Sequence, residues 1–125
     1  MTFKATPSVD LSQVALSAAE LLEPSGISAE VIDIRTTVPL DVPMIVDSVK
    51  KTSRAIVIDE GYERYGVTAE IASLIADEAF YYLDAPVKRL GAMDVPVPFS
   101  PVLEDQTVPT PKRVAQVAKR LCQKQ

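Results

Sequence analysis

The chain of 125 residues has the size of a single domain and is long enough to bury one hydrophobic core. Its formal net charge of −4 argues against a nucleic-acid-binding protein, and no apolar run is long enough to span a bilayer. The chain has no histidine, the commonest general base, and its single cysteine, Cys122, cannot form an internal disulfide. The N-terminal residues contain no apolar signal core, so we expect a protein that is not secreted.

The first third of the chain predicts a strand, a helix and a second strand. Residues 1–6 are mildly β-prone and predict a short first strand. Residues 27–34 alternate between apolar and polar at Ile27, Ala29 and Val31 and then pass into Ile32 and Ile34, as in a strand covered on both faces at one end. Between them, helical spacing from residue 11 ends at Pro24-Ser25-Gly26. The packing face of this helix is expected at Leu11, Val14, Ala15, Ala18, Leu21 and Leu22.

The middle of the chain predicts a helix, a central strand and a second helix. Asp41 is the expected N-cap of the first of these helices, and Pro43 falls in its first turn, where a missing N–H costs nothing. Residues 54–59 hold a continuous apolar run and predict the central strand, followed by a helix over 67–80. The apolar positions of the two helices are Val42, Ile45, Val46 and Val49, then Val67, Ile71, Leu74, Ile75 and Ala79. We expect Ala69, Ala72 and Ala76 to allow close approach to the sheet.

The loop between the central strand and this helix is the expected functional end of the sheet. Gly61 and Gly66 predict a sharp turn there, because glycine tolerates conformations that a Cβ forbids. Tyr62 and Tyr65 are interpreted equally well as loop packing or as a contact surface. The adjacent carboxylates at 59 and 60 are better explained as a strand-end aspartate and a solvated glutamate than as an acid–base pair.

The last third predicts a short strand, a proline-rich segment and a closing helix. The strand covers residues 87–90, and the helix covers 110–123. Residues 94–111 interleave prolines with apolar side chains, which predicts an ordered excursion docked on a surface. Strands and helices therefore alternate along the chain, which predicts an α/β fold with a mostly parallel sheet.

Little in the sequence points to catalysis. The two glycines of the loop make neither a dinucleotide-binding nor a P-loop motif. Glu70 is expected in the first turn of its helix, where a carboxylate interacts favourably with the helix dipole. A helix on the surface of a monomer does not ordinarily end in a run as apolar as Phe80-Tyr81-Tyr82-Leu83. We therefore favour an interface over core packing for this run.

Several runs together resemble one family. They are GISAEVIDIRT at 26–36, DEG at 59–61, AFYYLDAPVKR at 79–89 and DVPVPFSPVLED at 94–105. In this order and spacing they are similar to the C-terminal domain of transketolase-type enzymes. The similarity is greatest to the beta subunit of the thiamine-dependent decarboxylating component of 2-oxo acid dehydrogenase complexes, which act on pyruvate, branched-chain 2-oxo acids or acetoin.

The resemblance implies a three-layer α/β/α fold with a five-stranded, mostly parallel sheet and one antiparallel strand. It implies that residues 1–125 form a single domain, without the N-terminal domain that helps hold thiamine diphosphate. The parent enzyme, an α2β2 heterotetramer in the bacterial cytoplasm or the mitochondrial matrix, uses thiamine diphosphate and magnesium. Oxidative decarboxylation of a 2-oxo acid, by default pyruvate, would then deliver the acyl group to a lipoyl arm.

The resemblance also implies a role in assembly, with no catalytic, cofactor-binding or metal-binding residue in this chain. The expected partners are an alpha subunit, a second beta subunit and the dihydrolipoyl acyltransferase core, with no nucleic acid and no membrane. Glu104, Asp105 and the C-terminal end of the chain are candidates for docking a basic domain of the acyltransferase, and for the acidic pair a solvated loop is an equally good interpretation. The alternative function is a free-standing α/β binding module without activity. The candidate subunit interface is Tyr62, Tyr65, Phe80, Tyr81, Tyr82 and Phe99.

Overall fold

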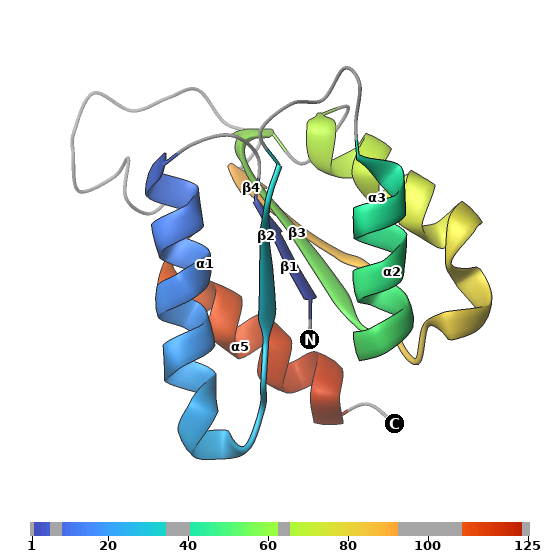
Figure 1. The fold of residues 1–125 in the computed structure, drawn as a ribbon. Coiled ribbons are helices and arrows are strands. Elements are labelled where there is room, and N and C mark those ends of the chain that lie inside the picture. The colour runs from blue at the N-terminus through green and yellow to red at the C-terminus, as the bar shows by residue number, and fades with distance from the viewer. Residues whose placement is uncertain (1, 6–8, 35–40, 63–65, 93–108, 124–125) are drawn as a thin grey trace.

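The computed structural model describes residues 2–5, 9–34, 41–62, 66–92 and 109–123. Within them, strands and helices alternate along the chain (Figure 1), as the sequence predicts. The strands are β1 (Thr2–Ala5), β2 (Glu30–Asp33), β3 (Ala55–Tyr62) and β4 (Lys88–Ala92). The α-helices are α1 (Val9–Leu22), α2 (Val42–Thr52), α3 (Val67–Glu78) and α5 (Pro111–Gln123). Two 3-10 turns, η1 (Glu23–Ser25) and η2 (Phe80–Tyr82), follow α1 and α3.

The four strands form one sheet in the order β2-β1-β3-β4, and all three pairings are parallel. Thr2 of β1 lies opposite Glu30 on one side and Ala55 on the other, so β1 is an inner strand. The α/β class is therefore confirmed. The expected fifth, antiparallel strand is not among the strands of the described residues.

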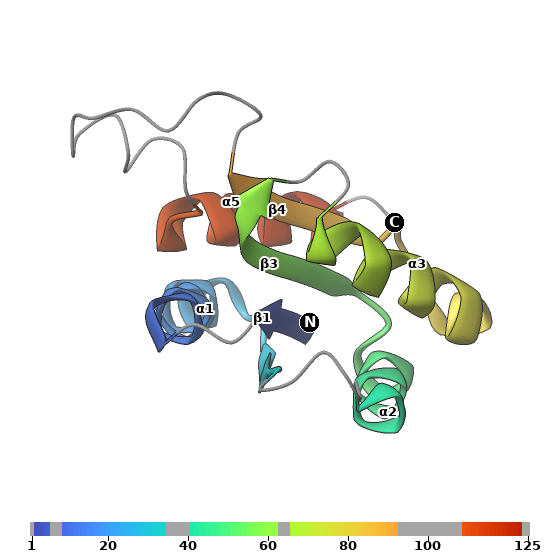
Figure 2. The ribbon, with the colours of Figure 1, turned by 90° about the horizontal axis from the view of Figure 1, so that it is seen from above.

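The helices cover both faces of the sheet. Helices α1 and α5 lie on one face, and α2 and α3 lie on the other (Figures 1 and 2). The chain therefore passes from β1 through α1 to β2, and then crosses back through α2 on the opposite face to reach β3. This is the three-layer arrangement that the resemblance implies.

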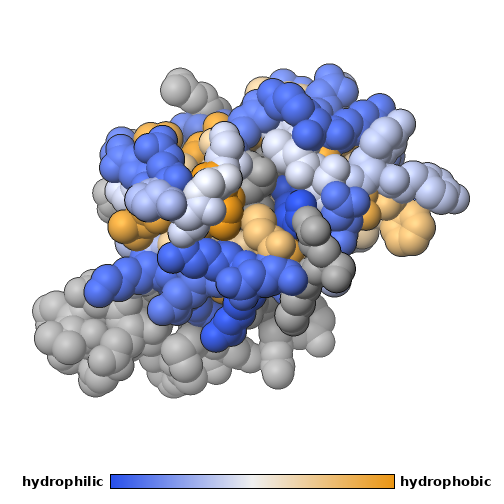
Figure 3. Space-filling view, turned by 90° about the horizontal axis from the view of Figure 1, so that it is seen from below, coloured by the Kyte–Doolittle hydropathy of each residue, from blue (hydrophilic) through white to orange (hydrophobic). Residues whose placement is uncertain are grey.

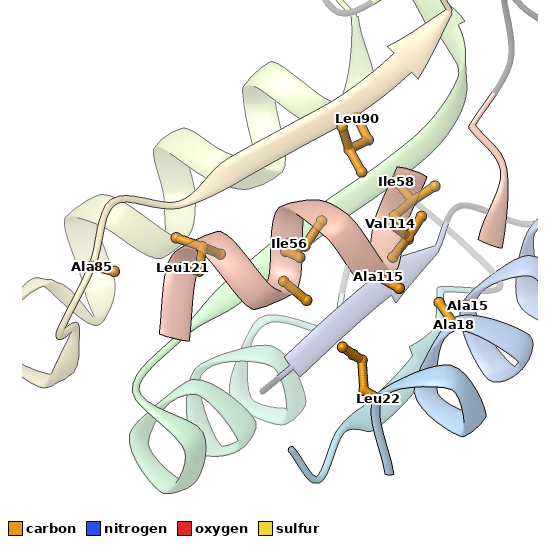
Figure 4. Packing of buried hydrophobic residues seen from close by; sticks show 11 residues of the cluster. Ala15, Ala18, Leu22, Ile56, Ile58, Ala85, Leu90, Val114, Ala115 and Leu121 are labelled. Carbon is orange, nitrogen blue, oxygen red and sulfur yellow. The ribbon is translucent and has the colours of Figure 1, made fainter. Parts of the chain in front are cut away.

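Strand β3 supplies both hydrophobic cores because its consecutive side chains point to opposite faces. Ile56 and Ile58 pack with α1 and α5, and Ala55 and Val57 pack with α2 and α3. All four are fully buried. Figure 4 shows the first core, where Leu22 of α1 and Leu121 of α5 approach the strand side chains.

Helices α2 and α5 have side-chain N-caps. The Asp41 side chain accepts a hydrogen bond of 3.2 Å from the Met44 N–H and so caps α2, as predicted. Thr110 caps α5 in the same way, since its Oγ1 accepts from the Arg113 N–H at 3.2 Å. Helix α2 ends at Ser53, which adopts a left-handed conformation with φ 65°.

Several predicted boundaries differ from the structure. Strand β3 continues to Tyr62, with an irregularity between Ile58 and Tyr62, instead of ending at residue 59. Gly61 therefore lies in a strand, and Gly66 is extended (φ −99°, ψ −176°), so the predicted glycine turn is wrong at these described positions. Strand β2 begins three residues later than predicted, because it pairs only with the four-residue β1.

Helix lengths and faces also depart from the predictions. Helix α1 begins two residues before the predicted start, and α3 ends at Glu78, after which the aromatic residues form η2. Leu21 and Val67 were expected in packing faces, but they are 48% and 38% exposed. Positions 94–108 of the predicted proline-rich segment lie outside the described residues, and Pro109, which also belongs to this segment, is buried.

Ser53 offers a direct test of the backbone at the end of α2. We expect Ser53→Gly to raise the free energy of unfolding by about 1 kcal/mol, because a Cβ is unfavourable in the left-handed region. Urea denaturation measures the change. The reciprocal control is Gly26→Ala, at φ 77°, where a Cβ would meet nothing within 4 Å. The free energy of unfolding of Gly26→Ala should fall by a similar amount, because the left-handed backbone is unfavourable for alanine even without a steric clash. A Gly26→Ala variant that is more stable than the original chain would contradict this explanation.

Candidate interaction surface

The described residues offer no constellation for catalysis or metal binding. Within the ranges of the chain that the structure describes, no three Asp, Glu or Cys side chains are grouped so that they could hold a metal ion. None of the described helices is both long and apolar enough to cross a membrane. The loops that follow β1 and β3, where a doubly wound sheet reverses direction and ordinarily binds ligands, lie outside the described residues.

The most unusual surface feature is the aromatic turn η2. It directly follows Ala79, which is fully buried at the end of α3. Phe80, Tyr81 and Tyr82 are 63%, 93% and 47% exposed. The Phe80 and Tyr81 rings meet edge to face, with centroids 5.3 Å apart and planes at 81°. Three adjacent exposed aromatic residues leave apolar area in water, which is typical of an interaction site.

The turn is held in place by the junction between α2 and β3. The Asp84 N–H donates a hydrogen bond of 2.9 Å to the Ser53 carbonyl, and the Leu83 side chain packs into the second core. The Lys50 ammonium lies 5.1 Å from the centroid of the Tyr82 ring, within the range of a cation–π contact. The aromatic side chains are therefore presented on a fixed backbone.

Arg54 lies at the same junction. Its guanidinium Nη1 is 4.0 Å from the Asp84 carboxylate, and its side chain is only 13% exposed. Its Nε and Nη2 are buried without a hydrogen-bond partner. Because the ion pair is long and Asp84 is largely exposed, we assign it a small contribution to stability.

A shallow groove of about 970 Å³ adjoins the aromatic turn. Phe80 and Tyr81 line it together with residues 83–87 and Arg89. The facing wall is a row of small side chains on α3, namely Ala69, Ala72, Ser73 and Ala76. Viewed from the end of the sheet where the strands begin, the described surface is largely hydrophilic, with apolar patches between the polar side chains (Figure 3).

The structure confirms only part of the predicted place of the α3 alanines. Ala72 packs against the second core beside the sheet, as the spacing predicts, but Ala69, Ala72 and Ala76 also line the groove, and Ala76 is exposed. Ile71 and Ile75 face the sheet instead and are buried. Sequence reasoning missed this groove because an alanine fits equally well against a sheet or against a partner.

The structure brings together only part of the predicted site. Phe80, Tyr81 and Tyr82 form one exposed cluster. Tyr62 lies in β3 with its backbone opposite Ala92, and Glu70 is exposed in the first turn of α3 as predicted. Cys122 is half-buried and packs against the first core. The remaining candidates, Tyr65, Phe99, Glu104 and Asp105, lie outside the described residues.

Comparison with known families and structures places this chain near one group. The family described as "Transketolase, C-terminal domain" matches residues 10–114. Among solved structures, the chain is similar to "Split gene transketolase, inactive beta4 tetramer", with a TM-score of 0.79 and 26% identity. That similarity covers 96% of this chain and 37% of the other.

Curated proteins are more similar in sequence. The "Pyruvate dehydrogenase E1 component subunit beta, mitochondrial" of Pisum sativum is 49% identical over 108 residues. The "Acetoin:2,6-dichlorophenolindophenol oxidoreductase subunit beta" of Bacillus subtilis is 50% identical over 107 residues. Each match covers 86% of this chain, which spans only 30% and 31% of the length of those relatives.

The contrast between the aromatic turn and the core beneath it can be measured. We expect Tyr81→Ser to change the free energy of unfolding by less than about 0.5 kcal/mol, because the side chain is almost fully exposed. The matched core variant, Ile75→Ala on the same segment, should lose about 2–5 kcal/mol, since its side chain is fully buried. Urea denaturation of both variants tests this. If Tyr81→Ser lowered the free energy of unfolding as much as Ile75→Ala, the aromatic turn would be part of the core.

Proposed function

The chain belongs to the transketolase C-terminal domain family, and we propose that it serves as the assembly domain of a 2-oxo acid dehydrogenase beta subunit. The subunit would be that of the thiamine-dependent decarboxylating component. Two observations support the proposal. The chain is 42–50% identical over most of its length to pyruvate dehydrogenase and acetoin-oxidising beta subunits. The aromatic turn beside the groove is the kind of surface that an assembly domain needs.

We propose that the parent enzyme oxidatively decarboxylates a 2-oxo acid and passes the acyl group to a lipoyl arm. Pyruvate is the substrate we favour, because relatives from a plant and from Rickettsia felis carry the name of pyruvate dehydrogenase. Acetoin is the competing substrate, since the Bacillus subtilis relative is equally similar. We place the parent enzyme in the bacterial cytoplasm or the mitochondrial matrix, in keeping with these relatives.

Thiamine diphosphate and magnesium belong to the parent enzyme in this proposal. The described residues hold no group of three Asp, Glu or Cys side chains that could bind the magnesium ion. We therefore propose that other domains of the parent hold the cofactor, that residues 1–125 form a single domain beside them, and that this chain alone is inactive.

The proposed contact with a second beta subunit uses the aromatic turn and the groove. Small side chains on α3 let another backbone approach closely, and each aromatic ring that is covered removes a large apolar area from water. Tyr62, Tyr65 and Phe99 remain proposed members of the same interface. The name of the similar solved structure, a beta4 tetramer, supports contacts between copies of such a chain.

The proposal includes two further partners. An alpha subunit would complete the component, since the relatives are named as beta subunits. Glu104 and Asp105 would dock a basic domain of the dihydrolipoyl acyltransferase core. The closing helix carries Arg120 in its last turn and no acidic residue, so it would repel such a domain, and the electrostatic attraction rests on the acidic pair.

The second candidate function is a free-standing binding module without catalytic activity. The two functions differ in whether another subunit covers the aromatic turn. A free-standing module would leave Tyr81 and the groove open to a small ligand or peptide, whereas an assembly domain covers them with another subunit. Association of the chain with itself therefore separates the two functions.

Sedimentation of the chain across a range of concentrations tests the assembly role. We expect reversible dimers that Tyr81→Asp weakens by about tenfold or more, because a charge would then be buried in an apolar contact. Tyr82→Asp should also weaken them, but it gives a less direct test, since its carboxylate can pair with Lys50. Lys51→Gln, which alters an exposed side chain of α2, is the control. A monomer at every concentration would favour the binding module.

The docking role is tested separately with the double variant Glu104→Gln and Asp105→Asn. We expect the affinity of the parent component for a purified acyltransferase subunit-binding domain to fall by about tenfold at low salt and less at high salt. Isothermal titration calorimetry measures both conditions. Unchanged affinity at low salt would assign the pair to a solvated loop.

A further inference from the structure

A strongly basic surface lies on β4 and α5, although the chain as a whole has a net charge of −4. Strand β4 reads KRLGA and α5 reads PKRVAQVAKRLCQ, so both carry Lys and Arg but neither carries Asp or Glu. We call this surface the basic face and define it by its cations, Lys88, Arg89, Lys112, Arg113, Lys119 and Arg120. All except Arg113 are exposed, and Arg113 is half-buried.

The two elements meet at a groove of about 220 Å³. Lys88, Arg89 and Arg120 surround it, and the apolar side chains of Leu90, Val117 and Leu121 line it. Leu90 and Leu121 are also buried members of the first core (Figure 4). The cationic side chains therefore project from a strand and a helix around a groove whose base is apolar.

Four of the six cations of the basic face are not neutralised within the described part of the chain. Lys88, Lys112, Lys119 and Arg120 form no ion pair with any described residue. Lys112 lies in the first turn of α5, next to Arg113, and no acidic residue accompanies them there. Cations at a helix N-terminus interact unfavourably with the helix dipole, which acidic side chains would stabilise. The sequence therefore carries an unfavourable local charge there, in addition to the repulsion between like charges.

The surroundings of the groove favour a protein partner over other anions. No aromatic side chain lies on β4 or α5, so the face lacks the stacking platforms that single-stranded nucleic acids use. The exposed large apolar residues of the described chain lie on α1, α2, α3 and η2, so the basic face also lacks apolar anchors for a membrane. A groove with an apolar base and cations at its edge is complementary in charge and polarity to a peptide that carries carboxylates around an apolar side chain.

We propose that the basic face binds an acidic segment of a partner protein. Carboxylates of that segment pair with Lys88 and Arg120, and one of its apolar side chains enters the groove. The inference does not depend on the proposed assembly role, because Lys88 and Arg120 line this groove and not the one beside the aromatic turn. Only Arg89 lines both grooves, so it is left out of the test.

The test uses a fluorescent synthetic peptide that repeats glutamate and leucine at helical spacing. We expect the chain to bind this peptide, with an affinity that falls as salt is raised. Lys88→Gln and Arg120→Gln should each weaken binding by about threefold, as expected for an exposed ion pair. The control Lys51→Gln removes the same charge from α2, on the opposite face of the sheet, and should leave binding unchanged. Fluorescence anisotropy measures each affinity.

Variation of the probe tests the groove without altering the protein. Replacing the leucines of the peptide with alanine should weaken binding, and replacing its glutamates with lysine should abolish it. Failure to bind the original peptide, or an equal loss with Lys51→Gln, would overturn the proposal. Equal affinity for double-stranded DNA or for vesicles of anionic lipid would also overturn it, because the face would then attract polyanions in general. None of these outcomes alters the sedimentation result that tests the assembly role.

Discussion

The burial of one apolar strand between two helical layers is the constraint on which the rest of this structure depends. Ala55, Ile56, Val57 and Ile58 are fully buried, and they alternate between the two faces of the sheet. A strand covered in this way removes apolar area from water on both sides, which is the main favourable contribution to folding. Helices α1 and α5 must therefore pack on one face, and α2 and α3 on the other (Figure 2).

The same strand fixes the candidate surface. The residues just before β3 hold the aromatic turn through the bond from the Asp84 N–H to the Ser53 carbonyl. The core thus anchors a segment whose own side chains remain in water, and Tyr81 is the extreme case. Exposed aromatic area on a rigid backbone costs little ordering entropy when a partner covers it. This is why we place assembly at the turn and a separate electrostatic contact on β4 and α5.

Sequence pattern alone predicted most of the secondary structure and only a part of the candidate site. Asp41 was recognisable as a cap because its side chain acts on the backbone three residues away, at Met44. The end of β3 was not recognisable from the sequence, because pairing between Tyr62 and Ala92 extends the strand beyond its apolar run. The alanines of α3 were assigned to the sheet because small side chains carry no signal about what approaches them.

The sequence by itself determined the α/β class, the N-cap of α2, the exposed aromatic run and the family, because these depend on local spacing and on short motifs. Only the tertiary structure decided the strand order, the groove along α3 and the basic face. The strand order and the basic face join segments far apart in the chain, such as Lys88 and Arg120, whose proximity follows from packing of both elements on the shared core. The groove is lined by α3 and the segment directly after it, and it depends on how these two are placed against each other. Net charge, a sum over the whole chain, conceals how that packing distributes the charges.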